Sequence, residues 1–357
     1  MDDKVILQIA GKRIENFISY EVEADLYHAA DRFSLELATP DTAIVPGMHC
    51  ELLVNSKVEM TGIIDFVQKG YSKQGRTLTV GGRDLLGILV DSYVEDFVTL
   101  KDKTIKEIAE FLIHANPKTG RPALPYISRC NIVGGGLWGG RDGGKPFPGF
   151  SDVSQEFTQP EPGMTVFEVL CGAAVSRGLM FFSRADGTMV FGRPKTKGKA
   201  LYTLMNTISG KGNCISAAEE TFDISQSYSK VTVIGPVKVK DRYGPVVMED
   251  VPTTVVDETF PFYKPFVTKL YSDSETPDLY ARMLLEKQRK EGYQLIYNVP
   301  GHSQGKTNFM INELAQVKDE MLEREGLFLI YNRKFKRSKL TGTTTELKLG
   351  PVGLVTA

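Results

Sequence analysis

Two stretches near opposite ends of the chain share one pattern. Residues 62–81 read GIIDFVQKGYSKQGRTLTVG, and residues 326–350 read GLFLIYNRKFKRSKLTGTTTELKLG. Each begins with a glycine and an apolar run, crosses a basic hairpin that contains a glycine, and returns through alternating residues to a closing glycine. This pattern predicts two similar β-modules that bracket the rest of the chain, the alternative being a chance likeness between two hairpins.

The first hundred residues also favour β-structure. Apolar residues such as Phe33 and Leu35 alternate with polar ones, and turn signals such as Pro46-Gly47 separate the short runs. We therefore expect a small antiparallel barrel or sandwich in this part of the chain.

The middle of the chain changes to a helical period. Thr104 and Glu107 form a capping box ahead of an apolar face, and Thr165 and Glu168 repeat that arrangement ahead of a second helix. The Asp-Gly pair at 186–187, which lies between apolar runs, predicts a β-hairpin with a two-residue turn.

Another helix is expected over residues 277–291, with Thr276 as its N-cap and Pro277 at its first position. Between the first two helices lies GGGLWGGRDGGKPFPGF, residues 134–150, which contains the only tryptophan, Trp138. This stretch has too much glycine and proline for a regular element, so we expect a long loop.

The composition sets wide limits on function. The 357 residues suffice for two or more domains, because single cores rarely exceed roughly 250–300 residues. A net charge of −1 predicts neither nucleic acid nor membrane as a partner. The start MDDKVILQIAG is unlike a signal peptide, and no run resembles a membrane span, so we expect the protein to stay in the cytoplasm until it is assembled. The cysteines are scattered, as is typical of free thiols; they are Cys50, Cys130, Cys171 and Cys214.

The stretch NVPGHSQGKTNF, residues 298–309, contains two apparent catalytic motifs. Gly301 to Gly305 fits G-x-S-x-G, the turn that presents the serine of an α/β-hydrolase. No histidine follows Ser303, although that fold places its histidine after the nucleophile. The same stretch is one residue short of the P-loop spacing. We expect a turn here, with glycines that serve backbone geometry.

No other motif predicts a metal, a cofactor or catalysis. The four histidines are isolated from one another, so they offer no paired metal ligands. A second glycine-rich loop has the P-loop spacing, but Lys145 is followed by Pro146, which has no hydroxyl for magnesium. The residues therefore indicate that the chain is not an enzyme.

Four segments resemble a known family. They are TVGGRDLLGILVD at 79–91, MTVFEVLCGAAVSRGLMFFSRADGTMVFGRP at 164–194, SQSYSKVTVIG at 225–235 and LKLGP at 347–351. The chain resembles the baseplate hub proteins of Mu-type contractile-tailed bacteriophages (tail protein P, or late control D), relatives of the T-even tail hub and of the type VI secretion spike hub. The resemblance extends over most of the chain, although each motif alone is only moderately specific.

The resemblance implies an α+β fold that is mainly β, with two similar antiparallel β-barrels, a mixed α/β domain and a small inserted domain. The expected boundaries are 1–97 for the first, tube-like barrel, 98–200 for the mixed α/β domain, 201–240 with 300–357 for the second barrel, and 241–299 for the inserted α/β domain.

Two local patterns conflict with the resemblance. Apolar residues from Met310 to Met321 are spaced like a helix face, whereas the family and the repeat both require strands there. Such hubs often carry Gly-Trp at a corner where this chain has Gly301-His302, so the packing of that corner is expected to differ.

By the same resemblance, the chain should be a structural baseplate hub. Three copies would form a ring, a pseudo-hexamer that adapts the six-fold tail tube to the three-fold central spike. The implied partners are the spike protein, the tail tube protein and other baseplate proteins, with DNA only in passage through the channel and no membrane insertion. The implied location is the virion, assembled in the host cytoplasm. The alternatives are the hub of a phage-derived bacteriocin or secretion device, and a tail-associated cell-wall hydrolase.

A basic run near the C-terminus is the candidate partner interface, together with Trp138. On a strand, its residues would alternate between two faces, and a contact with an acidic surface of the tube or spike would weaken in salt. A solvated hairpin is the alternative. The run consists of Arg333, Lys334, Lys336, Arg337 and Lys339.

Overall fold

The computed structural model describes residues 3–37, 43–73, 75–127, 133–134, 159–175, 178–240, 246–270 and 277–352. Trp138, Cys130, the expected N-cap Thr276 and the loop 134–150, apart from Gly134, lie outside these residues. Strands dominate the described part, and most of their pairings are antiparallel, as expected for a mainly β fold.

The N-terminal module comprises strands β1 to β7, which pair antiparallel in the order β3-β4-β7-β6-β5-β1-β2. Along β4 and β5, for example, alternate residues are buried in the core. The bounds are β1 (Val5–Ile9), β2 (Lys12–Ile14), β3 (Phe17–Asp25), β4 (Arg32–Leu37), β5 (His49–Val54), β6 (Lys57–Ser72) and β7 (Gly75–Asp84).

The C-terminal module is built from strands on both sides of an insert. Its main path is β12-β16-β21-β20, with β19 on β20 and β11 on β19. The bounds are β11 (Tyr202–Asn206), β12 (Ala217–Phe222), β16 (Tyr293–Pro300), β19 (Glu313–Asp319), β20 (Arg324–Ser338) and β21 (Gly342–Gly350).

The two modules share one order of pairing. β6 pairs with β7, β7 with β4 and β4 with β3, while β20 pairs with β21, β21 with β16 and β16 with β12. Strands β3 to β7 thus correspond in chain order to β12, β16, β19, β20 and β21. The likeness seen between the two hairpins therefore extends to five strands in each module. One pairing differs, because β1 joins β5 antiparallel whereas β11 joins β19 parallel.

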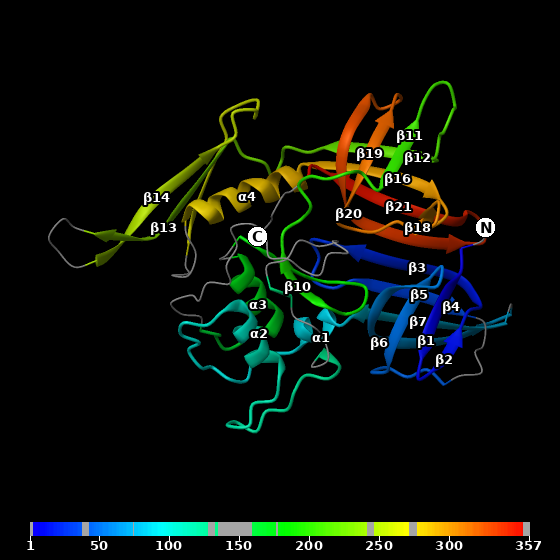
Figure 1. Cartoon of the computed structure of the whole chain (residues 1–357), viewed down its shortest axis with the longest axis horizontal. Helices are drawn as coiled ribbons and strands as arrows, with labels where there is room; N and C mark the ends of the chain where they lie inside the picture. Colours follow the sequence, from blue (N-terminus) through cyan, green and yellow to red (C-terminus); the bar gives the residue numbers. More distant parts are fainter. Residues whose placement is uncertain are drawn as a thin grey trace.

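An antiparallel pairing of β3 with β20 joins the modules into one 13-stranded sheet (Figure 1). Residues 20–25 lie opposite residues 332–337 at this junction. Among the strands that the structure describes, the pairing forms an open path and no closed barrel. A single apolar core extends through both modules, with Leu35 and Leu52 from one and Tyr297 and Leu347 from the other fully buried.

The segment expected to be mixed α/β has its own apolar core around short helices. Both predicted capping boxes are present: Thr104 Oγ1 accepts from the Glu107 N–H at 3.2 Å, and Thr165 Oγ1 accepts from that of Glu168 at 3.2 Å. The elements are α1 (Leu86–Asp91), α2 (Ile105–Ile113), β8 (Val133–Gly134), α3 (Val166–Val175), β9 (Met180–Ser183) and β10 (Met189–Gly192).

The predicted hairpin joins β9 to β10, but its turn is longer than the Asp-Gly pair suggested. The Arg184 N–H donates to the Thr188 carbonyl at 2.8 Å and leaves three residues in the loop. Gly187 has φ of +80°, the left-handed conformation that such three-residue loops place at their last position.

The insert consists of a separate three-stranded sheet, β14-β13-β15, packed against α4. Its pairing differs from the expected grouping at two points: residues 230–240 belong to this sheet, and 293–300 pair with the C-terminal module. Figure 1 shows the insert projecting from the modules. The bounds are β13 (Lys230–Lys240), β14 (Val246–Val256), β15 (Pro265–Lys269) and α4 (Pro277–Glu291).

The helix-like spacing between Met310 and Met321 proves misleading. This region contains β19, and β20 begins just after it, at Arg324, so strands lie here as the family resemblance required. Buried residues in β19 follow a two-residue period over Ala315, Val317 and Asp319. Of the apolar residues that matched a helix face, Leu314 and Val317 are core residues of β19, whereas Met310 and Met321 lie outside the strand.

A buried ion pair spans the junction. Arg333 on β20 and Glu59 on β6 are 2% and 8% exposed, and the guanidinium Nη1 donates to the Glu59 carboxylate at 2.5 Å. The same nitrogen donates to the Phe309 carbonyl at 3.2 Å, and the guanidinium lies 4.0 Å from the centroid of the Phe335 ring. The other Glu59 oxygen accepts from Asn308 at 2.7 Å. Both charges are thus paired away from water.

We predict that Arg333→Ala is strongly destabilising. The change would leave the Glu59 carboxylate buried without its cation, which costs about 3–5 kcal/mol in comparable sites. Urea unfolding of the purified variant measures the loss in free energy of unfolding.

Lys336→Ala is the matched control, because it removes a cation from the same strand. Lys336 pairs with Glu346 at 2.6 Å, but their side chains are 34% and 17% exposed, so water screens the pair and the expected loss is at most about 1 kcal/mol. Equal losses for the two variants would contradict a structural role specific to the buried pair.

Candidate partner interface

The basic run lies at the end of β20, and the strand sends its residues to two faces as predicted. Arg333 and Phe335 point into the core, whereas Lys334 and Lys336 lie on the outer face and are partly exposed. Arg333 is therefore not available at the surface. The sequence could not show this, because a basic run with a regular two-residue period suggests a solvated strand as readily as a half-buried one.

The two lysines are already paired within the chain. Lys334 Nζ lies 3.3 Å from the Glu21 carboxylate and 3.5 Å from that of Glu23, both on β3. Lys336 pairs with Glu346 on β21. The acidic residues on both neighbouring strands therefore neutralise the middle of the basic run.

Sequence reasoning missed these acidic partners. The signal was present in the alternation of YEVEAD in β3, which places its two glutamates on one face of the strand. What the chain order does not reveal is that β3 lies beside β20, more than 300 residues later.

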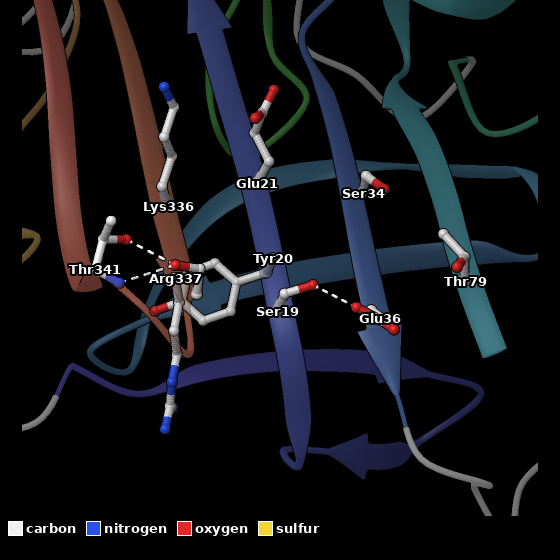
Figure 2. Close-up of a pocket in the computed structure, with 10 residues that line it drawn as sticks. Ser19, Tyr20, Glu21, Ser34, Glu36, Thr79, Lys336, Arg337 and Thr341 are labelled. Carbon is white, nitrogen blue, oxygen red and sulfur yellow. Dashed lines mark hydrogen bonds between the residues drawn. The ribbon is translucent and has the colours of Figure 1, made fainter. Parts of the chain in front are cut away.

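Beside these ion pairs, the outer face of the sheet has a shallow polar hollow. Figure 2 shows its side chains, among them Ser19 and Glu36, which hydrogen-bond to each other at 2.7 Å. The hollow reaches from Thr79 on β7 across β4 and β3 to Arg337 on β20. It is lined by hydroxyl, carboxylate and basic groups, so it offers a polar contact surface rather than an enclosed binding pocket.

Arg337 and Lys339 are the exposed cations of the run. They border a second shallow hollow with Asp3, Gly301 and Thr343, at the end of the β20–β21 hairpin. Within the described part of the chain, neither side chain makes an ion pair. These two residues therefore remain as candidates for contact with an acidic partner. Trp138 lies outside the described residues.

The GHSQG stretch has the geometry of a turn. Gly301 has φ of +74° and follows β16, and Gly305 has φ of +65° in the tight hairpin between β17 (Ser303–Gln304) and β18 (Thr307–Asn308). A hydrolase elbow leads from a strand into a helix, whereas this stretch leads into further strands. The expected turn is confirmed.

His302 packs beneath this turn. Its ring is fully buried, with Nε2 2.8 Å from the Tyr20 hydroxyl, Nδ1 3.0 Å from Thr345 Oγ1, and its ring centroid 4.4 Å from that of Phe335. The pKa of the imidazole is lowered to about 4, chiefly by burial, with the Asp3 charge opposing this shift and the Arg333 charge adding to it. At neutral pH the ring is therefore an uncharged core residue that holds β3 against the C-terminal module.

Neither a metal site nor a membrane helix is found in the described residues. No group of three or more His, Cys, Asp or Glu side chains is placed to hold a metal ion there. No described helix is long and apolar enough to cross a membrane.

Comparison with known proteins gives consistent matches. Residues 4–84 match the family described as Mu phage baseplate assembly protein GpP-like, N-terminal. The chain is 24% identical over 303 residues to the baseplate hub protein gp44 of Escherichia phage Mu, with 81% of this chain and 71% of that protein covered.

Solved structures agree over nearly the whole length. A tail protein from Neisseria meningitidis has a TM-score of 0.80 at 25% identity, covering 98% of this chain and 96% of that one. A prophage MuSo2 tail protein from Shewanella oneidensis has a TM-score of 0.73 at 20% identity, covering 98% of both chains. A type VI secretion component from E. coli, described as similar to the T4 tail proteins gp27 and gp5, has the same fold at 12% identity, with a TM-score of 0.60 and 98% and 79% of the chains covered.

The buried imidazole predicts a pH effect on stability. In the unfolded chain a histidine has its ordinary pKa of about 6.5, so between about pH 4 and 6.5 the unfolded state binds more protons. The folded chain should lose stability as the pH falls through this window. His302→Gln should reduce the loss of unfolding free energy between about pH 7 and 4.5, measured by urea unfolding at each pH.

His28→Gln provides the control. His28 is exposed beside Asp25, and the hydrogen bond to that carboxylate raises the pKa of its imidazole, so its contribution to stability has the opposite sign and is lost as the pH rises. An undiminished loss of stability in the His302 variant would show that this ring does not set the acid sensitivity.

Proposed function

We propose that this chain, a relative of the Mu-type baseplate hub proteins, is the structural hub of a contractile tail, three copies of which form a ring between tail tube and central spike. The tube has six-fold symmetry and the spike has three-fold symmetry, so an adaptor must present six similar sites on one side and three on the other. The chain acts in this role by its shape and its contacts, without catalysis.

The shared strand order of the two modules is the observation that supports this proposal. One chain carries two units with the same pairing of five strands, so three copies supply six similar units around one exact three-fold axis. Similar units at six positions match a six-fold tube. The features that differ between the two units of a chain, including the insert, occur only three times in such a ring and therefore match the three-fold spike.

The proposed division follows the pairing and the apolar cores. Residues 1–84 form the first barrel-like unit of the ring and residues 85–200 a mixed α/β domain, because Leu85, Leu86 and Leu89 pack in the core of the latter. The second unit combines the strands at 201–229 and 293–357, and 230–292 form the insert. The insert starts about ten residues earlier than expected, because β13 pairs with β14 in the insert sheet. It also ends about seven residues earlier than expected, because β16 pairs with β21 in the C-terminal module.

A catalytic role has no support. The relatives described above are a baseplate hub protein, tail proteins and a secretion component, none of them described as an enzyme. The hydrolase-like Ser303 lies in a strand of a tight hairpin. We infer that the chain is a virion protein of the tail baseplate, assembled in the host cytoplasm, with DNA only passing through the ring.

The native mass tests the trimer. A ring of three should have about three times the chain mass of 39.6 kDa, measured by light scattering coupled to size-exclusion chromatography. A dimer or a hexamer of this chain would contradict the adaptor, because neither combines six similar units with one three-fold axis.

The exposed cations at the hairpin end give a second test. We predict that Arg337→Gln with Lys339→Gln weakens binding to the cognate spike or tube protein, and that binding by the parent chain falls with added salt because the contact is electrostatic. Titration calorimetry at two salt concentrations measures both effects.

The matched control is Lys197→Gln with Lys199→Gln, which removes the same charge from two exposed positions elsewhere. Equal binding by the hairpin variant and the control, with no dependence on salt, would exclude this contact for the partner tested.

A further inference from the structure

Several strand edges in the described part of the chain have no neighbouring strand, such as the outer edges of β2 and β11, and two others lie on β6 and β12. β5 covers only the first half of β6, up to Ile63, and residues 66–71 pair with β7 alone. At the far end of the sheet, β12 pairs only with β16. Unpaired strand edges of this kind are templates for pairing with another chain.

The free half of β6 corresponds to a half of β20 that does have a partner. β20 pairs with β19 up to Ile330, shifts register before Asn332, and continues along β3. β6 pairs with β5, shifts register between Ile64 and Phe66, and then continues without a neighbour on that side. β6 and β20 therefore share one pairing pattern, but after the register shift only β20 has a second neighbouring strand within the same chain.

The missing neighbour corresponds to β12. In the chain order of the modules β12 occupies the place of β3, the strand that fills the junction beside β20. The β3–β20 pairing within one chain is therefore a model for a pairing between chains. In that pairing, β12 of one copy lies beside β6 of the next copy and extends its sheet.

The internal repeat also fixes the register. Tyr20 faces Leu35, which faces Val80, and Ala218 faces Tyr297, which faces Leu347. Val80 in β7 and Leu347 in β21 lie at the same position relative to the register shift of their strand pair. Ala218 in the C-terminal module therefore corresponds to Tyr20 in the N-terminal module.

The second reference point is the register shift itself. Asn332 in β20 and Phe66 in β6 are the first residues paired after the shift in each strand. Counted from these two residues, Tyr71 in β6 is the position equivalent to Arg337 in β20. Since Tyr20 faces Arg337 in the internal junction, Ala218 should face Tyr71 between copies.

We propose that β12 of one copy pairs antiparallel with residues 66–71 of β6 in the next copy, in the register of the internal β3–β20 junction. This inference rests on the ring of three proposed above and names its contact. Thr221 then lies opposite Gln68, and Phe222 lies opposite Val67.

The side chains along the two edges suit this pairing. Phe66, Tyr71 and Phe222 are among the large apolar side chains that the single chain leaves exposed, at 47%, 91% and 64%. The register brings Phe222 against Val67 and puts Lys69 opposite Glu220, a carboxylate that also pairs with Arg324 at 2.6 Å in its own chain. Apolar and oppositely charged cross-strand pairs each stabilise a sheet by roughly 0.2–1 kcal/mol.

A second copy of this chain is the occupant that fits both edges at once. Joining one kind of edge to a different kind is a heterologous contact, which either closes into a ring or extends as a filament. In a closed ring of three, every copy covers one β6 edge and one β12 edge of its neighbours, so no equivalent edge remains free.

Paired cysteines test the register. The variant Gln68→Cys with Thr221→Cys places two exposed positions face to face, with Cβ atoms about 5 Å apart across neighbouring copies. Treatment of the native assembly with a short thiol crosslinker should give a covalent trimer on a denaturing gel. The parent chain, with its native cysteines, should remain monomeric on the same gel.

The slipped pair Gln68→Cys with Phe222→Cys is the matched control, because a shift of one residue moves a side chain to the other face of the sheet. Crosslinking of the matched pair but not of the slipped pair supports the register. Equal crosslinking of both, or none of the matched pair in a variant that retains the trimer mass, overturns it while leaving the adaptor intact. A monomer mass for the parent chain overturns the proposed function as well.

Discussion

The antiparallel pairing of β3 with β20 is the constraint on which the rest of the structure depends. It brings the first strands of the chain against the last ones, and it does so around a buried charge: Arg333 on β20 reaches Glu59 on β6 across the junction. Because a buried charge without its partner is costly, the pairing of the Arg333 and Glu59 charges favours one relative arrangement of the two modules. The common core and the continuous outer face both follow from that arrangement.

The same junction explains why the basic run is weaker as a surface feature than its sequence suggests. Its residues alternate between a core that needs one cation and an outer face where β3 and β21 supply carboxylates for Lys334 and Lys336. Only the hairpin end, with Arg337 and Lys339, extends beyond these partners. The role of each cation on this strand therefore depends on the residues beside it. A cation is paired in the core, paired with a carboxylate on the outer face of the sheet, or exposed at the surface.

Local signals predicted the fold well, and long-range pairing set their limit. Capping boxes, hairpin glycines and two-residue alternation are read within a few residues, so α2, α3, the β9–β10 hairpin and the repeat were accessible from sequence. The helical spacing between Met310 and Met321 failed because the core residues Leu314 and Val317 of one strand, β19, and the flanking methionines match a helix face by chance. The partners of Arg333 and Lys334 lie hundreds of residues away in the sequence, and the insert boundaries depend on strand pairings that span tens of residues, so no local pattern encodes either.

The contacts of Asp3 and Asp25 have a consequence for synthesis on the ribosome. The Asp3 carboxylate accepts from the His302 N–H, and Asp25 accepts from Asn332, at sequence separations of 299 and 307 residues. A nascent chain that has completed β1 to β7 still lacks the strand that covers β3, and it must keep that edge out of other pairings while about 250 further residues are made. The order of translation thus makes β3 the segment most in need of protection before the chain is released.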